Sequence, residues 1–150
     1  MPTSASLLVQ RFYLEVWNRA DETVARELLH PNFAFRASLG PEKQGPDGFI
    51  EYMRSIHAAL ANYTCAIDDL IAAGNRAAAR LTFSGRHRGR FFEVEATGRE
   101  ISWNGGAFFT MDDNQIVELW VVGDVDRVKQ QLNAPKQATF PYDGNAFRKP

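Results

Sequence analysis

The order of apolar and polar residues divides the chain into a helical first half and a second half of alternating strands. In residues 6–19 apolar side chains recur at nearly every fourth position, the spacing of a helix with one buried face. These positions are Leu8, Phe12 and Val16. Asp21 is a good N-cap for a second helix, which is predicted to end near Leu29 because a proline follows.

A third helix is predicted to begin at Pro46, a residue that fits the first helical turn. Its apolar stripe consists of Phe49, Met53, Ile56 and Leu60. Between the second and third helices, residues 32–37 suit a short extended segment and residues 39–45 suit a loop. All three helices are amphipathic, so each must cover an apolar surface.

Alternation of apolar and polar residues then predicts strands that could provide this surface. The expected strands are 64–69, 77–84, one beginning at Phe91 and Phe92, 101–111 and 116–124, followed by a helix over 125–132. Gly105 and Gly106 suggest a bulge or a strong bend. The prediction is an α+β fold, with three N-terminal helices packed on a strongly curved, mixed or antiparallel sheet and a pocket between them.

Length and charge narrow the class of protein. The 150 residues suit one domain, expected over 1–133, with 134–150 as a tail that is either disordered or an arm exchanged between subunits. A net charge of -1 gives no reason to expect nucleic acid. The basic run 86–90 is either an anion site or a solvated hairpin end. The single cysteine, Cys65, excludes an intrachain disulfide. No signal peptide or membrane span is apparent, so we expect a cytoplasmic protein that does not bind membranes.

The residues that could perform chemistry leave two interpretations open. Trp120 and Asp124 share one face of the last strand. If this face is outward, Asp124 is a solvated strand end or the N-cap of the next helix. If it faces the pocket, apolar walls raise the carboxyl pKa and allow acid–base catalysis. His87 likewise is either a structural hairpin residue or a group at the cavity mouth that polarises a carbonyl. The histidines lack metal-ligand spacing, and no phosphate loop or nucleophile elbow occurs.

Several runs resemble a known family. They are 85–89 (GRHRG), 96–103 (ATGREISW), 116–124 (IVELWVVGD), 12–18 (FYLEVWN) and 45–49 (GPDGF). Together these runs resemble the SnoaL-like polyketide cyclases and ester cyclases of the nuclear transport factor 2-like superfamily, over about residues 6–133.

This resemblance implies a cone of helices in a curved sheet, assembled as a homodimer or higher homo-oligomer through the outer sheet face. It also implies intramolecular aldol cyclisation of a small molecule without metal or organic cofactor. Asp124 matches the proton-shuttling aspartate of the family, and His87 matches a histidine that could stabilise enolate charge. Arg36 stands where many relatives have histidine, which favours an anionic ligand. The expected pocket walls are Trp103, Trp120, Tyr13, Trp17 and Met53.

Three functions therefore remain open. The first is a cofactor-independent cyclase, lyase or isomerase that acts on a carbonyl-rich or aromatic molecule through Asp124. The second is a non-catalytic small-molecule-binding protein with the same pocket. The third is an interaction module that uses the outer sheet face and the tail.

Overall fold

The computed structural model describes residues 4–39 and 42–135, and it has the predicted α+β architecture. Its helices are α1 (Ala5–Arg11), η1 (Phe12–Trp17), α2 (Glu22–Leu28), α3 (Gly45–Ala59) and α4 (Val125–Leu132). Its strands are β1 (Leu29–Arg36), β2 (Glu42–Gln44), β3 (Leu60–Ala73), β4 (Arg76–His87), β5 (Glu100–Asp112) and β6 (Gln115–Gly123). The tail predicted over 134–150 lies almost wholly outside the described residues.

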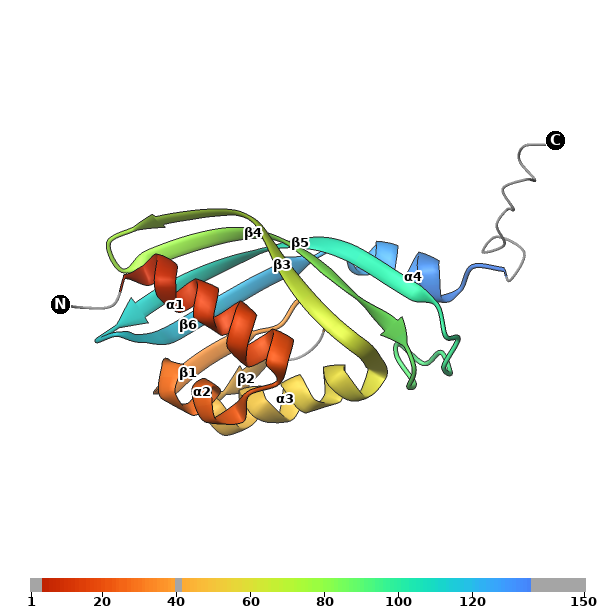
Figure 1. The fold of residues 1–150 in the computed structure, drawn as a ribbon, viewed down its shortest axis with the longest axis horizontal. Coiled ribbons are helices and arrows are strands. Elements are labelled where there is room, and N and C mark those ends of the chain that lie inside the picture. The colour runs from red at the N-terminus through yellow and green to blue at the C-terminus, as the bar shows by residue number, and fades with distance from the viewer. Residues whose placement is uncertain (1–3, 40–41, 136–150) are drawn as a thin grey trace.

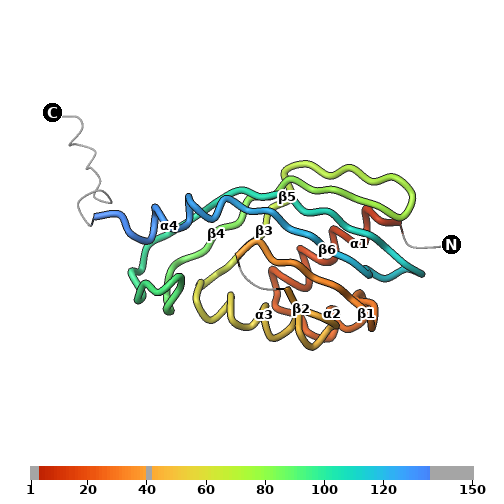
Figure 2. Tube along the Cα trace, turned by 180° about the vertical axis from the view of Figure 1, so that it is seen from behind, coloured from red at the N-terminus to blue at the C-terminus, as the bar shows by residue number. Residues whose placement is uncertain are grey.

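The strands form one mixed sheet in the order β2-β1-β6-β5-β4-β3. The pairing of β1 with β6 is parallel and the other pairings are antiparallel. Helices α1, α2 and α3 lie together on one side of this sheet (Figure 1). Seen from behind, the long strands lie side by side along the length of the molecule, and α4 lies at the end opposite the N-terminus (Figure 2). The curved sheet and the three helices thus enclose an apolar interior.

The first predicted helix is continuous, but its second half is a π-helix. Ser4 caps α1 by accepting a hydrogen bond from the N–H of Leu7. In η1 four apolar side chains are buried, in two adjacent pairs: Phe12 with Tyr13, and Val16 with Trp17. Isolated π-turns are rare and are often found at functional sites. This one determines which aromatic groups of the first helix reach the interior.

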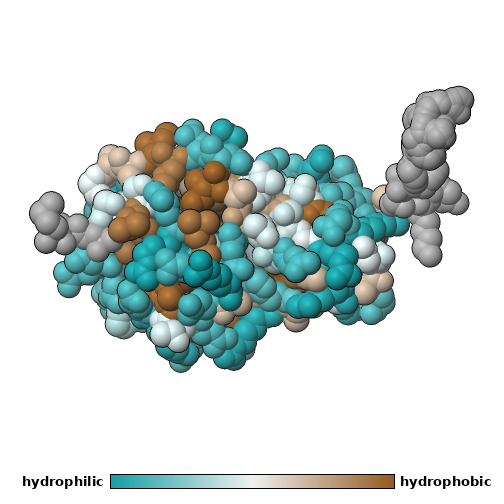
Figure 3. Space-filling view, viewed as in Figure 1, coloured by the Kyte–Doolittle hydropathy of each residue, from teal (hydrophilic) through white to brown (hydrophobic). Residues whose placement is uncertain are grey.

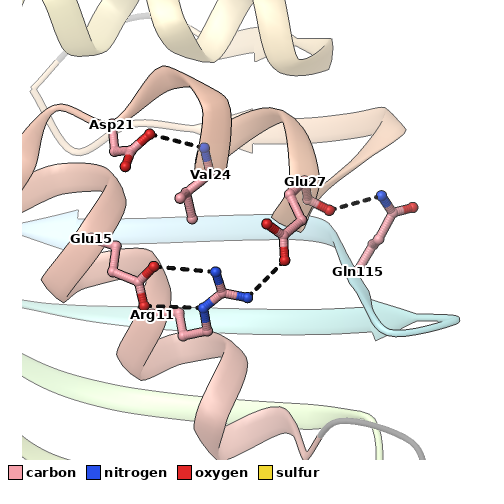
Figure 4. A network of polar contacts seen from close by, with 6 residues as sticks. All are labelled: Arg11, Glu15, Asp21, Val24, Glu27 and Gln115. Carbon is pink, nitrogen blue, oxygen red and sulfur yellow. Dashed lines mark hydrogen bonds and ion pairs between the residues drawn. The ribbon is translucent and has the colours of Figure 1, made fainter.

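A polar network connects the first helical segment to α2 and the sheet (Figure 4). The Arg11 guanidinium lies 3.0 Å from the Glu15 carboxylate and 2.8 Å from that of Glu27. Gln115 of β6 donates to the backbone carbonyl of Glu27 at 3.1 Å, and Asp21 caps α2. Because these ion pairs are partly solvated, each stabilises the fold only slightly. Their main effect is to fix the position of η1 relative to α2.

Two predicted elements were wrong. Phe91 and Phe92 do not begin a strand, because Phe92 and Glu93 adopt positive φ values of 48° and 64° and turn the chain back on itself. Only an isolated bridge joins Phe91 to Val94. Within the predicted loop 39–45, in contrast, residues 42–44 form the edge strand β2, which pairs with β1.

Of the bulge or strong bend expected at Gly105 and Gly106, the bulge is absent, because both residues continue the β4–β5 and β5–β6 ladders. The irregularity in β5–β6 lies between Thr110 and Met111 instead. Glycine is needed at 105 for packing: a Cβ atom there would come within 2.7 Å of the Phe83 ring. The absent side chain therefore lets Phe83 pack against the sheet.

Apolar side chains reach the surface in two places. On the face shown in Figure 3 they gather around α1 and the far part of the β3–β4 hairpin, where Leu7, Leu14 and Ile71 are exposed. The outer sheet face exposes Phe108 and Trp120, whose rings lie 6.1 Å apart. Among the described residues, no helix is long and apolar enough to cross a membrane.

Candidate functional site

An interior cavity of about 30 Å³ lies between the helices and the concave face of the sheet. Its walls come from η1, from β1 and the segment that follows it, from α3, and from the strands β3, β4 and β6. They are Tyr13, Trp17, Phe35, Ala37, Ser38, Leu39, Tyr52, Tyr63, Phe83, Leu119 and Val121. A space of this size has room for about one water molecule. The cavity is therefore nearly filled by the side chains that surround it.

Aromatic rings make up most of the cavity wall and contact one another at their edges. The Trp17 ring lies 5.3 Å from that of Tyr63 at an interplanar angle of 64°, and the Phe35 ring lies 5.5 Å from that of Tyr52. Edge-to-face contacts of this kind are favourable beyond the area they bury. Flat faces of such rings are suited to a planar ligand.

The electrostatics of the cavity are those of a neutral site, because no charged residue is among the described residues that line it. Burial raises the pKa of Tyr13 and Tyr63 well above the ordinary value, and burial also raises the pKa of Tyr52. Beside them, burial raises the pKa of the Cys65 thiol to about 12. All four groups therefore remain protonated at neutral pH, and the phenols can act as hydrogen-bond donors.

An open groove of about 480 Å³ adjoins the cavity on the outside. It runs between α3 and the 91–94 turn and is lined by Leu39, Lys43, Glu51, Tyr52, Ser55, Ile56, Phe91 and Phe92. Leu39 and Tyr52 line both spaces. These two residues therefore form the partition between groove and cavity.

Three of the predicted pocket residues lie in or beside the cavity. Tyr13 and Trp17 line it. The Trp103 ring is buried behind the wall, 5.4 Å from the ring of Phe83. Met53 is fully buried in the core, but it is not among the cavity-lining residues. Of the five expected wall residues, Tyr13 and Trp17 therefore have side chains that line this cavity.

Arg36 and Trp120 lie outside the cavity, contrary to expectation. Inward positions on their strands are held by Phe35, Leu119 and Val121. Arg36 donates to the carbonyl of Val121 at 3.0 Å, and its guanidinium carbon lies 4.7 Å from the centroid of the Trp120 ring. The pair therefore belongs to the outer sheet face, where its cation–π contact joins the neighbouring strands β1 and β6.

Asp124 is exposed at the end of β6. Of the two interpretations of this residue, the structure therefore has the one in which its side chain points outward. Its carboxylate accepts a hydrogen bond from the N–H of Arg127 at 3.1 Å and caps α4. Its own N–H donates to the carbonyl of Asn104 at 3.0 Å. The shared face of Trp120 and Asp124 was predicted correctly, but it is the solvent face.

His87 is completely buried, with an exposed fraction of 0%, but it does not line the cavity. Its Nδ1 accepts a hydrogen bond from the N–H of Thr97 at 3.1 Å, so the neutral ring carries its proton on Nε2. Its backbone N–H and carbonyl bond to Arg99 and Gly98. The position of His87 is that of an anchor for the loop between β4 and β5.

Most of the sequence corresponds to one family. A sequence model described as SnoaL-like polyketide cyclase matches residues 7–132. The chain belongs to the SnoaL-like polyketide cyclase family. Comparison with curated protein sequences found no match.

Solved structures agree with this family assignment. A candidate SnoaL-like polyketide cyclase from Jannaschia sp. CCS1 superposes with a TM-score of 0.80 at 20% identity, covering 90% of this chain and 96% of that chain. TsrD from Streptomyces laurentii superposes with a TM-score of 0.77 at 26% identity, covering 90% of this chain and 100% of that chain. A SnoaL-like polyketide cyclase from Agrobacterium tumefaciens superposes with a TM-score of 0.72 at 19% identity, covering 87% of this chain and 98% of that chain. These likenesses establish the shared fold.

Several wall residues of this family member were not singled out from the sequence. Tyr63 and Phe83 could have been found, because each alternates with solvent-facing neighbours on its strand. Ser38 and Leu39 follow β1 and are separated by many residues from the other wall positions. Periodicity contains no information about which loop folds across the open end of a sheet.

Proposed function

We propose that this SnoaL-like protein binds a small planar, aromatic or carbonyl-rich molecule between its helices and sheet. The observation that supports the proposal is the cavity itself, whose described walls are uncharged and mostly aromatic. Apolar concave sites with a few polar groups are the usual form of small-molecule sites. Family membership supports the same class of ligand.

A ligand larger than water requires the cavity and the groove to join. The cavity measures about 30 Å³ and the groove about 480 Å³, and among the residues that the structure describes only Leu39 and Tyr52 line both. Rotation of the Tyr52 ring, which is partly exposed, would open the partition without disturbing the strands. The proposed binding space is therefore the cavity together with the inner part of the groove.

Tyr52 variants test this binding space with the bicyclic hydrocarbon indane as the probe. Tyr52→Ala removes the partition and should accelerate association of indane by about tenfold or more, whereas the matched control Tyr52→Phe keeps the ring and should bind at about the wild-type rate. Stopped-flow tryptophan fluorescence measures both. Absence of indane binding to every variant would reject the proposal.

A second proposed function is cofactor-free aldol cyclisation with Asp124 as acid and base, favoured by the family to which the chain belongs. A carboxylate removes a proton beside one carbonyl, the enolate carbon bonds to a second carbonyl, and the carboxyl returns the proton to the new alkoxide. The product is an isomer of the substrate, so no co-reactant is needed. Asp124 would take part after its carboxylate leaves the α4 cap.

Asp124→Asn separates this function from binding alone. Asparagine is as good an N-cap as aspartate, so the fold should be preserved while the base is lost. A linear diketone that can close to a six-membered ring is the probe, and mass spectrometry and chromatography follow its cyclised isomer. Wild-type turnover that disappears in the Asn variant supports the reaction. Equal turnover, or none with the wild type, leaves binding as the function.

We also propose that the outer sheet face pairs with a second copy of the chain. Phe108, Trp120 and Val122 are 47%, 45% and 45% exposed on this face. Arg80 and Glu118 are exposed on its two sides and carry opposite charges. A two-fold axis places such a patch against itself, so an acid on one protomer can meet a base on the other.

Sedimentation velocity measures this association. The wild type should sediment as a dimer at micromolar concentration, and Trp120→Glu should shift it to monomer because it places a charge in the centre of the apolar contact. Leu14→Glu, on the opposite side of the molecule, is the matched control and should leave the dimer intact. A wild-type monomer, or a dimer unaffected by Trp120→Glu, would exclude this interface.

A further inference from the structure

The indole N–H of Trp103 is a buried hydrogen-bond donor without a partner among the described residues. The side chain is 1% exposed, so water does not satisfy it from the surface. Buried polar groups in native proteins are nearly always paired, and an unpaired one needs an explanation. Packing alone does not require a nitrogen here, because phenylalanine presents a similar apolar surface.

The position of this donor gives the explanation. A Cβ atom on Gly123 would lie 3.5 Å from Trp103 Nε1 and 2.8 Å from the Ser38 Oγ. The indole N–H and the hydroxyl therefore converge over the same glycine, which has no side chain to separate them. Ser38 also lines the cavity, as do Tyr63 and Phe83, whose rings lie 6.2 Å and 5.4 Å from that of Trp103. The two polar groups thus border the wall of the aromatic cavity.

A donor in uncharged surroundings selects a neutral acceptor. An anionic group would need a cation, and no charged residue is among the described residues that line the cavity. The phenols of Tyr13 and Tyr63 stay protonated because burial raises the pKa of each, so they add no charge. A carbonyl oxygen has two lone pairs and can accept from the indole and from the hydroxyl at once.

We propose that Trp103 Nε1 and Ser38 Oγ form a subsite for one carbonyl oxygen of a neutral, planar ligand, with Gly123 as its floor. The inference rests on the proposed binding function and adds the group by which the ligand is oriented. Trp103 is a binding residue in this account, and a Cβ atom at Gly123 would lie within 2.8 Å of the Ser38 Oγ, so only glycine leaves the subsite open. Ligands without an acceptor at this point lose the hydrogen bonds but keep the apolar contacts.

Two probes of the same shape test the subsite: the ketone indanone and the hydrocarbon indane. Isothermal titration should show that the wild type prefers indanone by about fivefold to tenfold, the effect of one or two net hydrogen bonds. Trp103→Phe should abolish this preference and leave the affinity for indane within about twofold. The carbonyl stretch of bound indanone should lie at lower frequency in the wild type than in Trp103→Phe.

Ser38→Ala and Gly123→Ala complete the experiment. Ser38→Ala should reduce the preference for indanone in part, and Gly123→Ala should abolish it, because its methyl group would contact the Ser38 hydroxyl. If Trp103→Phe does not fold, as judged by circular dichroism, these two variants and the wild-type carbonyl stretch decide. Binding of both probes with equal affinity overturns the subsite and leaves the binding function in place. Binding of neither probe to the wild type overturns both.

Discussion

At the scale of single residues, Asp124 shows that a strand pattern predicts which residues share a face but not whether that face points inward. Alternation correctly grouped Trp120 with Asp124 on one face. It could not say which face is concave, because both faces of this strand contain apolar residues. Leu119 and Val121 are the inward pair, and Asp124 caps α4.

The cap predicts how Asp124 contributes to stability. Asp124→Ala should lower the free energy of unfolding by about 1 kcal/mol, because the N–H of Arg127 loses its acceptor. Asp124→Asn should cost almost nothing, since asparagine caps equally well. Urea denaturation monitored by circular dichroism measures both values. A large loss in the Asn variant would mean that the charge, rather than the cap, is what stabilises the fold.

The buried phenols predict a dependence of stability on alkaline pH. Burial raises the pKa of Tyr13, Tyr52 and Tyr63 in the folded state, while the unfolded pKa is about 10. The folded state therefore binds these protons more tightly, so stability is fully present below about pH 10 and falls as pH rises above it. The urea midpoint should therefore be lower at about pH 11 than at about pH 8.

Replacement of Tyr63 by phenylalanine provides the control for this titration. Tyr63→Phe removes one of the ionisable groups and should make the alkaline loss of stability smaller. The phenolate absorbance that comes from Tyr13, Tyr52 and Tyr63 should rise together with unfolding rather than before it. Ionisation of all tyrosines in the folded protein near pH 10 would contradict the buried positions.

At the scale of elements, the helices and the long strands follow from periodicity, and the failures occur where local backbone geometry overrides it. The 91–94 turn contains two phenylalanines, a residue type that favours strands, yet the backbone of Phe92 and Glu93 adopts the left-handed conformation. The shift between Ala61 and Thr64, next to the left-handed Asn62, likewise changes which residues of β3 face inward. Beyond the shift, Tyr63 and Cys65 are buried while Thr64 and Ala66 are exposed, so the alternation that indicates Tyr63 begins only after Asn62.

His87 is predicted to hold the loop of residues 88–99 rather than to react. His87→Leu removes the acceptor for the Thr97 N–H and should accelerate hydrogen exchange of that amide by about tenfold. His87→Asn can place a side-chain oxygen near the Nδ1 position and should retain more of the protection. NMR-detected exchange compares the three proteins. Unchanged protection in His87→Leu would show that backbone hydrogen bonds alone hold the loop.

At the scale of the whole molecule, the fold was predictable and the exact site was not. Three helices with apolar stripes followed by alternating strands are sufficient to predict the α+β class, and the family match over residues 7–132 agrees with it. The cavity instead depends on where Ser38, Leu39 and the η1 side chains meet across the sheet. Such contacts join distant parts of the chain and depend on helix geometry that composition does not determine.

The positions of the three tryptophans make a direct test of the interior binding site possible. Trp17 lines the cavity, Trp103 is buried beside it, and Trp120 is exposed on the outer sheet face. The measurement is a two-dimensional ¹H–¹⁵N NMR titration of the full chain with indane, with each indole signal assigned by a Trp→Phe variant. The account predicts that the Trp17 and Trp103 signals shift and that the Trp120 signal stays in place. A titration that moves Trp120 alone, or none of the three, would contradict it.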